Sequence, residues 1–327
     1  MTDQLLQAFT DSVPEHANEI RLFSVMRNEA QRVPYFLKYY VEEGVDRFFI
    51  VDNDSTDGTT DLLKSGSNVH VFRTSNSYSA SRCGTDWLET LLADYGVGHW
   101  CIIADADEFL VYPCHEQASL PQLCKYLDSE QVSAFPCLLV DMYSNRPFDE
   151  TDCVPGTDPL SACPFFESES ILCVGSPKQV QMGKWSHWGG MRRRLFNLNP
   201  CLDKIVLIKY VSTIKLYPGM HGVSGANVSQ MRGASLHFKY LADFSFRAAR
   251  EARRGEHWND AYEYRAYSQM TARNRQLCAY GPLSQRLSGS TDLINAGIMS
   301  RPDGFISWLS VDRSGLSPAS NSCHQEE

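Results

Sequence analysis

The segment from His99 to Leu110 is an apolar run that ends in three carboxylates, those of Asp105, Asp107 and Glu108. A run this short between polar residues predicts a buried β-strand. Asp105 and Asp107 are two residues apart, so an extended chain would place both on one side. Two carboxylates that close raise each other's pKa unless a cation lies between them. Such oxygen ligands suit Mg²⁺ or Mn²⁺ carrying a phosphate ester, although an exposed acidic turn would give the same sequence.

Two more polar clusters follow predicted strands upstream of these carboxylates. Residues 27–29 (Arg-Asn-Glu) follow a strand at 21–26, and residues 52–59 follow a strand at 48–51. Helices are expected between the strands, so the pattern predicts βαβ units and a largely parallel sheet. Ligands of such sheets bind beyond the carboxyl ends of the strands. Three polar clusters at one edge of one sheet therefore predict a single ligand site.

The elements that must position these clusters can be read from the apolar periodicity. The first predicted helix has Pro34 in its first turn and stops at Gly44. The other predicted helices are 59–64, 79–95 and 242–254, and the other predicted strands are 69–72, 132–141, 204–210 and 234–240. We expect an N-terminal extension at 1–18, one domain at 19–285 with an irregular insertion at about 143–190, and a C-terminal extension at 286–327. The polar, Ser-rich end from about residue 312 is predicted to be disordered.

Composition excludes several classes of protein. The chain has 327 residues, of which 43% are hydrophobic, and a net charge of −9, which argues against nucleic acid as the main partner. No apolar run is long enough to cross a bilayer, and the start of the sequence lacks the pattern of a signal peptide. The eleven cysteines are scattered without a Cys-x-x-Cys pair, so neither a zinc ribbon nor a thioredoxin-like site is indicated. We expect a reduced, cytoplasmic protein.

The three clusters together resemble the motifs of family 2-type glycosyltransferases. Residues 27–29 and 51–59 match the start of that pattern, and Asp-Ala-Asp-Glu-Phe-Leu at 105–110 stands where these enzymes carry an Asp-x-Asp motif. The last form is closer to the family 92-like branch and to bacterial relatives. The resemblance covers residues 21–110 well and continues more loosely to Trp258. It implies an α/β protein of the GT-A fold: a Rossmann-like, mostly parallel sheet flanked by helices, with a C-terminal helical region.

The resemblance also implies an activity and a donor site. The expected reaction is the metal-dependent transfer of a sugar, as by a hexosyltransferase, from a UDP-sugar to a hydroxyl of a glycan or other acceptor. The residues that it assigns to the donor are Arg27, Glu29, Asp52, Asp54, Arg82 and Asp105. Asp52 or Asp54 would accept a hydrogen bond from N3–H of uracil. Mn²⁺ or Mg²⁺ would be held by Asp105, Asp107 and His237, with His221 as the rival for the third ligand.

Further residues are predicted to bind the diphosphate, to bind the acceptor and to remove the proton of the acceptor hydroxyl. Lys239 shares a strand side with His237 and would neutralise the leaving diphosphate. Acceptor candidates are the stacking rings of Trp185 and Trp188, His187 between them, and the arginines at 192–194. An extended chain would turn either Arg192 and Arg194 or Arg193 alone toward the site, and we assign Arg192 and Arg194. The base that an inverting enzyme needs is predicted to be Asp141, followed by Asp203, Asp243 and Glu167. The usual carboxylate pair of the family is missing, which leaves inversion or retention open.

Two other functions compete with this interpretation. A nucleotidyltransferase shares the sheet and the paired acids, but it is expected to open with a Gly-rich phosphate loop ending in Arg, whereas the first strand here leads into Arg27-Asn28-Glu29. A transferase-like module that binds sugar without catalysis is the second alternative. The intact pair of Asp105 and Asp107 argues against that alternative. These motifs do not specify the sugar, the acceptor or the oligomeric state.

Overall fold

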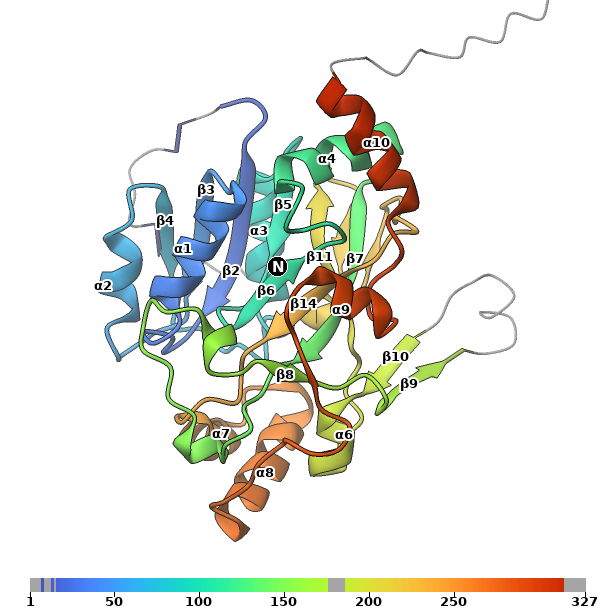
Figure 1. The fold of residues 1–327 in the computed structure, drawn as a ribbon. Coiled ribbons are helices and arrows are strands. Elements are labelled where there is room, and N and C mark those ends of the chain that lie inside the picture. Colours follow the sequence, from blue (N-terminus) through green and yellow to red (C-terminus); the bar gives the residue numbers. More distant parts are fainter. Residues whose placement is uncertain (1–6, 9–12, 15, 176–185, 315–327) are drawn as a thin grey trace, which may run out of the picture.

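A mixed β-sheet forms the centre of the molecule (Figure 1). The computed structural model describes residues 7–8, 13–14, 16–175 and 186–314. Within them the sheet has nine strands in the order β1-β4-β3-β2-β5-β11-β7-β14-β6. Their bounds are β1 Gln7–Ala8, β2 Ile20–Met26, β3 Arg47–Asp52, β4 Val69–Arg73, β5 Trp100–Ile103, β6 Glu108–Val111, β7 Ala134–Asp141, β11 Asp203–Lys209 and β14 Gly233–His237.

Most strands of the sheet run in one direction. β4, β3, β2 and β5 are mutually parallel, and β7 and β14 form a second parallel pair. β11 is antiparallel to both β5 and β7, so the two parallel groups point the same way. Six of the nine described strands share that direction, and β1, β11 and β6 oppose it. This confirms the predicted α/β class, with a mostly parallel sheet flanked by helices.

Helices cover both faces of the sheet and one of its ends. The described helices are α1 Val33–Glu43, α2 Thr59–Lys64, α3 Thr85–Tyr95, α4 Leu120–Ser129, α6 Met191–Phe196, α7 Phe244–Arg254, α8 Trp258–Arg273, α9 Ser290–Asn295 and α10 Asp303–Ser314. Apolar residues of α1, α4, α9 and α10 pack in one core cluster, and those of α3 pack in another. α7 and α8 lie beyond the end of the sheet toward which β2 points (Figure 1).

Helix α1 shows how local sequence fixes one of these elements. Pro34 occupies the first turn, where its missing N–H costs nothing. Gly44 ends the helix with φ of +99°, a left-handed conformation that suits glycine, and its N–H donates to the Val41 carbonyl. Phe36 and Tyr40 are fully buried against the sheet. Each contributes roughly 1.5–3 kcal/mol through burial.

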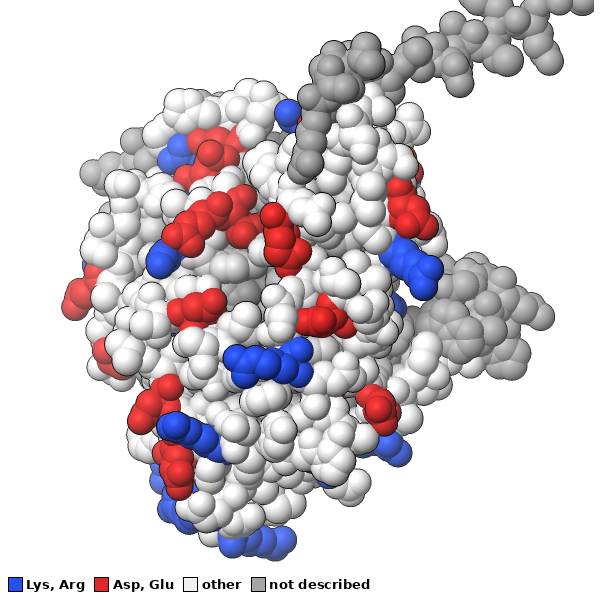
Figure 2. Space-filling view, in the orientation of Figure 1, with Lys and Arg blue, Asp and Glu red and all other residues white. Residues whose placement is uncertain are grey.

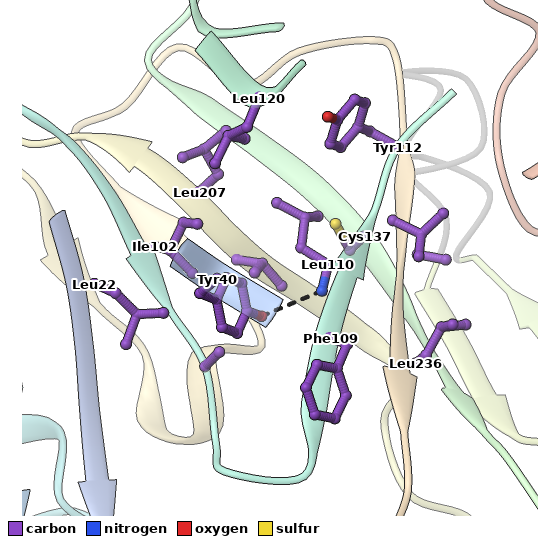
Figure 3. Packing of buried hydrophobic residues seen from close by; sticks show 14 of the residues in the cluster. Leu22, Tyr40, Ile102, Phe109, Leu110, Tyr112, Leu120, Cys137, Leu207 and Leu236 are labelled. Atoms are coloured by element: carbon purple, nitrogen blue, oxygen red, sulfur yellow. Dashed lines mark hydrogen bonds between the residues drawn. The ribbon is translucent and has the colours of Figure 1, made fainter. Parts of the chain in front are cut away.

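Tyr40 also ties the core to the segment that carries the carboxylates. Its hydroxyl accepts from the backbone N–H of Leu110 at 3.2 Å (Figure 3) and donates to the carbonyl of Glu108 at 3.0 Å. Phe109 packs between these contacts, with its ring 6.2 Å from that of Tyr40. β6 therefore contacts Tyr40 through both its backbone and the Phe109 ring. These contacts also fix the position of the turn that precedes β6.

The remaining described elements are short and lie mainly in the irregular region and near the later strands. They are η1 Phe148–Glu150, η2 Pro159–Ser161, β8 Phe165–Phe166, β9 Ile171–Val174, β10 Ser186–Gly189, β12 Lys215–Leu216, η3 Pro218–Met220, β13 Val223–Ser224 and β15 Gln285–Arg286. Residues 176–185 of the predicted insertion and the predicted disordered end at 315–327 lie outside the described residues. Across the described ranges, no helix is both long and apolar enough to cross a membrane.

One predicted helix is shorter than expected. The helix predicted at 79–95 begins only at Thr85. Arg82, Cys83 and Gly84 have φ of +52°, +57° and +79°, values at which a right-handed helix cannot continue. The sequence pattern missed this because the spacing of apolar residues does not indicate the sign of the backbone angle φ.

Candidate active site

A pocket of about 680 Å³ opens at the carboxyl ends of the parallel strands. Its lining includes residues that follow β2, β3, β5 and β14, together with side chains of α6, α7 and α8. In Figure 1 the pocket's helical wall, α7 and α8, lies at the end toward which the arrows of β2 and β14 point. The position is the one that the strand-end rule predicted.

Asp105 and Asp107 both line this pocket, but they do not lie on a strand. β5 ends at Ile103, and the chain turns back through residues 104–107 into β6, with the N–H of Glu108 donating to the Asp105 carbonyl at 3.0 Å. The expected alternation of an extended chain is therefore wrong here. The turn leaves Asp105 exposed to the pocket and buries Asp107 to 7% exposure.

The Asp105 carboxylate has no hydrogen-bond or ion-pair partner in the part of the chain that the structure describes. Partial loss of hydration inside the pocket raises the pKa of its carboxyl group to about 6, and the carboxylates of Glu108 and Asp107 raise this pKa too, against the lowering effect of Lys204. An open, unpaired acid among other acids is a place where a cation would be stabilised.

His237 stands between two carboxylates. Its Nδ1 is 2.7 Å from Oδ1 of Asp141, and its Nε2 is 3.5 Å from Oδ2 of Asp107. Burial alone would lower the pKa of His237, but the charges and hydrogen bonds of Asp107 and Asp141 raise it. When Nδ1–H donates to Asp141, the Nε2 atom is aimed at the Asp107 carboxylate.

Asp141, the first candidate for the base, is fully engaged. Oδ1 contacts His237 and Oδ2 accepts from Nε of Arg192 at 2.9 Å. Burial alone would raise the pKa of Asp141, but Arg192 and His237 hold it below its ordinary value. The side chain is 3% exposed and is not part of the pocket lining. These contacts suit a residue that positions His237, and they leave no free oxygen to take a proton from an acceptor.

Lys239 lies two residues beyond His237 and also lines the pocket. Its ammonium is 4.8 Å from the centre of the Tyr264 ring and 5.6 Å from that of Tyr267, both on α8. Between the two pocket residues, Phe238 points into the core. The two side chains thus share one side of the chain, and their catalytic and metal-binding roles stay predictions.

Asp105, Asp107 and His237 are residues of the types that bind divalent cations. No three His, Cys, Asp or Glu side chains converge as a ready ligand group within the described ranges, so the trio of Asp105, Asp107 and His237 is not assembled as it stands. However, a carboxylate oxygen and an imidazole nitrogen face each other at 3.5 Å, and a second carboxylate is unpaired in the same pocket. Oxygen and imidazole donors together are compatible with Mn²⁺.

The turn after β3 presents Asn53 to the pocket, flanked by the two predicted base-reading acids. The carbonyl of Asn53 accepts from Nη1 of Arg27 at 2.5 Å, and its Oδ1 accepts from Nη2 of Arg254 at 2.9 Å. Asp52 is fully buried and accepts hydrogen bonds from the Ser55 N–H and the Thr60 hydroxyl.

Three of the predicted donor residues make ion pairs. Asp54 is exposed and pairs with Arg73 at 3.0 Å. Arg82 pairs with Asp86 at 2.6 Å and Glu89 at 2.7 Å, and neither Arg82 nor Asp54 lines the pocket. Glu29 does line it and pairs with Arg247 of α7 at 2.5 Å. The structure thus brings Arg27, Glu29 and Asp105 together and leaves Asp52, Asp54 and Arg82 outside.

The predicted acceptor residues are divided in the same way. Trp188 lines the pocket with 37% of its surface exposed, whereas Trp185 lies outside the described residues. The Nδ1 atom of His187 is 2.7 Å from Oδ1 of Asp203, and His187 does not reach the pocket. Asp203 is thereby occupied as well.

The expectation that Arg192 and Arg194 face the same way is wrong. Residues 191–196 form the short helix α6, where positions two apart point about 200° apart around the axis. Arg192 lines the pocket and pairs with Asp141 and Glu263. Arg194 instead pairs with the buried Glu167 at 2.5 Å and donates to the Ala279 carbonyl.

Several pocket residues were missed by the sequence analysis. Lys204 of β11 and Glu108 form an ion pair at 2.8 Å in the pocket wall. Helix α7 contributes Arg247, Arg250, Glu251 and Arg254, which repeat every three or four residues and so share a face. That spacing was a readable signal, because four charges on one face of a helix that also buries Phe244 and Ala248 require partners.

The pocket lining has a slight excess of cations, seven against six carboxylates, in a protein of negative net charge. The cations in its lining are Arg27, Arg192, Lys204, Lys239, Arg247, Arg250 and Arg254. On the face shown in Figure 2, basic side chains lie among acidic ones at the lower end, over α7 and α8. A local field of this kind can attract a phosphate ester although the whole chain carries a charge of −9.

Glu251 gives a prediction for stability. Burial alone would raise its pKa, but contacts with His257, Arg250 and Arg254 lower it from 4.5 to about 2. Because the folded pKa is the lower one, the stabilisation is fully present above about pH 4.5 and is lost as the pH falls through about 2. Because burial lowers the pKa of His257, the charged partners of Glu251 at pH 7 are Arg250 and Arg254, and Glu251→Gln should lower the free energy of unfolding by roughly 1.5–3 kcal/mol.

Urea unfolding of both chains from pH 7 downward measures this difference. The curves of the parent and of Glu251→Gln should converge as the pH approaches 2. A difference that does not change with pH would show that the carboxylate charge is not what stabilises this contact.

Comparisons with known proteins include a distant sequence match and weak structural matches. No family model matches the chain. It is 28% identical over 114 residues to a glycosyltransferase family 92 protein of Arabidopsis thaliana, a match that covers 32% of this chain and 18% of that protein. The chain is thus distantly similar to part of a glycosyltransferase, from one of the two families that its motifs resemble.

Two solved structures show limited likeness. One is assigned as a glucose-1-phosphate thymidylyltransferase from Bacillus anthracis, with 6% identity, a TM-score of 0.27 and coverage of 39% of this chain and 56% of that one. The other is the inositol-1-phosphate CTP transferase of T. maritima, with 12% identity, a TM-score of 0.25 and coverage of 93% and 99%. TM-scores this low carry no argument about fold or function.

Proposed function

We propose that this chain is a glycosyltransferase that moves a sugar from a nucleoside diphosphate sugar to an acceptor hydroxyl and needs a divalent cation to do so. One observation carries the proposal. The unpaired carboxylate of Asp105 lies in the same strand-end pocket as the facing Asp107 and His237, and cations line that pocket. Both the motif resemblance and the distant family 92 similarity support the same chemistry.

In this proposal the cation is held by Asp107 and His237, with Asp105 as the third ligand. When bound, it supplies positive charge to the diphosphate of the donor. Asp141 holds Nδ1–H of His237, which keeps Nε2 available. Lys239, whose pKa is raised above its ordinary value by the Tyr264 ring and Asp107 despite burial, stays charged beside the leaving diphosphate.

The nucleotide is proposed to lie against the loops that follow β2 and β3. Arg27 and Asn53 line that end of the pocket and are fixed to each other through the Asn53 carbonyl. Uracil is the base we propose, on the resemblance of the turn at 52–59. Asp52 supports that turn from within, since both of its oxygens accept hydrogen bonds of the turn itself.

The proposal is tested by a donor screen with the full chain. In a screen of UDP-, GDP- and dTDP-sugars, we expect a UDP-sugar to release UDP in the presence of Mn²⁺, with release stopped by EDTA and restored by added Mn²⁺. Release of pyrophosphate from a nucleoside triphosphate would instead identify a nucleotidyltransferase. Calorimetric binding of UDP with no turnover of any donor would identify a sugar-binding module.

A further inference from the structure

His221 occupies the side of the pocket away from the nucleotide loops. It follows η3, and its Nδ1 is 2.8 Å from the carbonyl of Asp203 at the start of β11. A carbonyl can only accept, so Nδ1 carries the proton and Nε2 is left with its lone pair. The ring lines the pocket, and Nε2 has no hydrogen-bond partner among the residues that the structure describes.

Gly219 provides the space for this ring. Its φ is +68°, and a Cβ built on it would lie 2.9 Å from both Cδ2 and Nε2 of His221. Any larger residue at 219 would have to displace the imidazole. The loop geometry therefore keeps the nitrogen with the lone pair in place.

The carboxylates near the pocket are poorly placed to accept a proton. Asp141, Asp203, Asp243 and Glu167, the four predicted bases, are each paired with a cation or a histidine. The carboxylates of the lining that pair with a cation or a histidine, within the described ranges, are Glu29, Asp107, Glu108, Glu251 and Glu263. Asp105 is the unpaired one, and it is assigned to the cation.

We propose that His221 is the general base for the acceptor, an inference that rests on the proposed function. Nε2 takes the proton of the acceptor hydroxyl while that oxygen forms a bond to the anomeric carbon of the donor. The bond from this carbon to the diphosphate oxygen breaks, and its electron pair leaves with the nucleoside diphosphate. The imidazolium then returns its proton to water. Attack from the side opposite the diphosphate inverts the configuration.

The groups around His221 agree with this role. Lys204 of β11, Arg192 of α6 and Glu108 of β6 line the same pocket as His221, and Lys204 pairs with Glu108. Enclosure by the pocket and Lys204 lower the pKa of His221, with a lesser contribution from Arg192, against opposite effects of the Asp203 carbonyl and Glu108. Lys204 and Glu108 also act on the charge of Asp105, so this ion pair influences both the proposed base and the proposed cation site.

The test compares His221→Asn with the parent chain and with His16→Asn, an exposed histidine. Asparagine keeps a donor near the position of Nδ1 but has no counterpart to Nε2. We expect sugar transfer to fall about 10²–10⁴-fold, Mn²⁺-dependent UDP binding to stay within twofold, and the acidic limb of the pH–rate profile to disappear. Imidazole should partly restore transfer by His221→Ala. Transfer within threefold of the parent, or an equal loss of UDP binding, overturns the inference.

Gly219→Ala leaves the imidazole in the chain and displaces it, so it should lose transfer in the same way. The proton on His221 is located independently of turnover by nitrogen-15 NMR of histidine-labelled protein. If the parent turns over no donor, the proposed function fails and the base role of His221 fails with it, whereas the NMR result tests the His221 tautomer on its own. A proton on Nδ1 with an unprotonated Nε2 at pH 7 supports it, and a proton on Nε2 overturns it.

Discussion

Asp107→Asn is expected to lower kcat/KM for sugar transfer by roughly 10³-fold, the upper end of what removal of one electrostatic stabiliser costs. The change keeps the shape of the side chain and removes the negative charge that faces Nε2 of His237 at 3.5 Å. A neutral amide is a much weaker partner for a divalent cation than a carboxylate. The measurement is nucleoside diphosphate release per folded molecule, with the folded fraction taken from circular dichroism.

Asp128→Asn is the matched control for this substitution. Asp128 is an exposed carboxylate paired with Lys209 at 2.6 Å, outside the pocket. Its loss should leave transfer unchanged, as an exposed ion pair contributes little. If Asp107→Asn retains more than a tenth of the parent's kcat/KM, or if the parent is equally active in EDTA, the pocket works without the proposed cation.

The half of the fold that could be predicted is the half in which neighbours in sequence are neighbours in space. β2, α1 and β3 follow one another, and each has a local signal such as the apolar run of β3 or the Gly44 stop. Their parallel pairing brings Arg27 and Asn53 to one edge without further information. The strand-end pocket followed from the same rule.

The features that were not predicted depend on pairings between distant residues. The chain turns at residues 104–107 because β6 pairs with β14, where Val111 lies opposite Ala234, and nothing near Asp105 announces that partner. Similarly, Arg192 became a pocket residue only because α6 places it against Asp141, 51 positions earlier. The residues next to a carboxylate in the sequence indicate that it can bind a cation or accept a proton. Only its contacts in the folded structure show whether its oxygens are free to do so.

Asp141 provides the sharpest test of that distinction. Asp141→Asn should weaken Mn²⁺ binding about 10–100-fold, the usual effect of losing the partner that orients a ligating histidine. An amide has one acceptor, so it cannot accept from both Nδ1–H of His237 and Nε of Arg192 as the carboxylate does. Either Arg192 loses its buried partner or His237 is forced toward the tautomer with its proton on Nε2, directed at Asp107.

The same substitution should lower the free energy of unfolding by roughly 3–5 kcal/mol, because Arg192 and Asp141 are only 6% and 3% exposed and a broken buried pair leaves a charge uncompensated. Asp243→Asn is the control, since it removes a carboxylate that Arg32 contacts twice, at 2.9 and 3.0 Å, without touching His237. It should cost stability and leave Mn²⁺ affinity intact.

Urea unfolding and Mn²⁺ titration by calorimetry, made on the same samples, separate the two possible roles of Asp141. A positioning residue loses cation affinity and stability together when it becomes asparagine. A base would lose kcat alone, with Mn²⁺ affinity unchanged, because neither of its oxygens would then be needed to hold His237. The short contact of 2.7 Å between Asp141 and Nδ1 of His237, and the 2.9 Å contact with Arg192, favour the first result, because a carboxylate with both oxygens so engaged would have to break a buried contact before it could accept a proton.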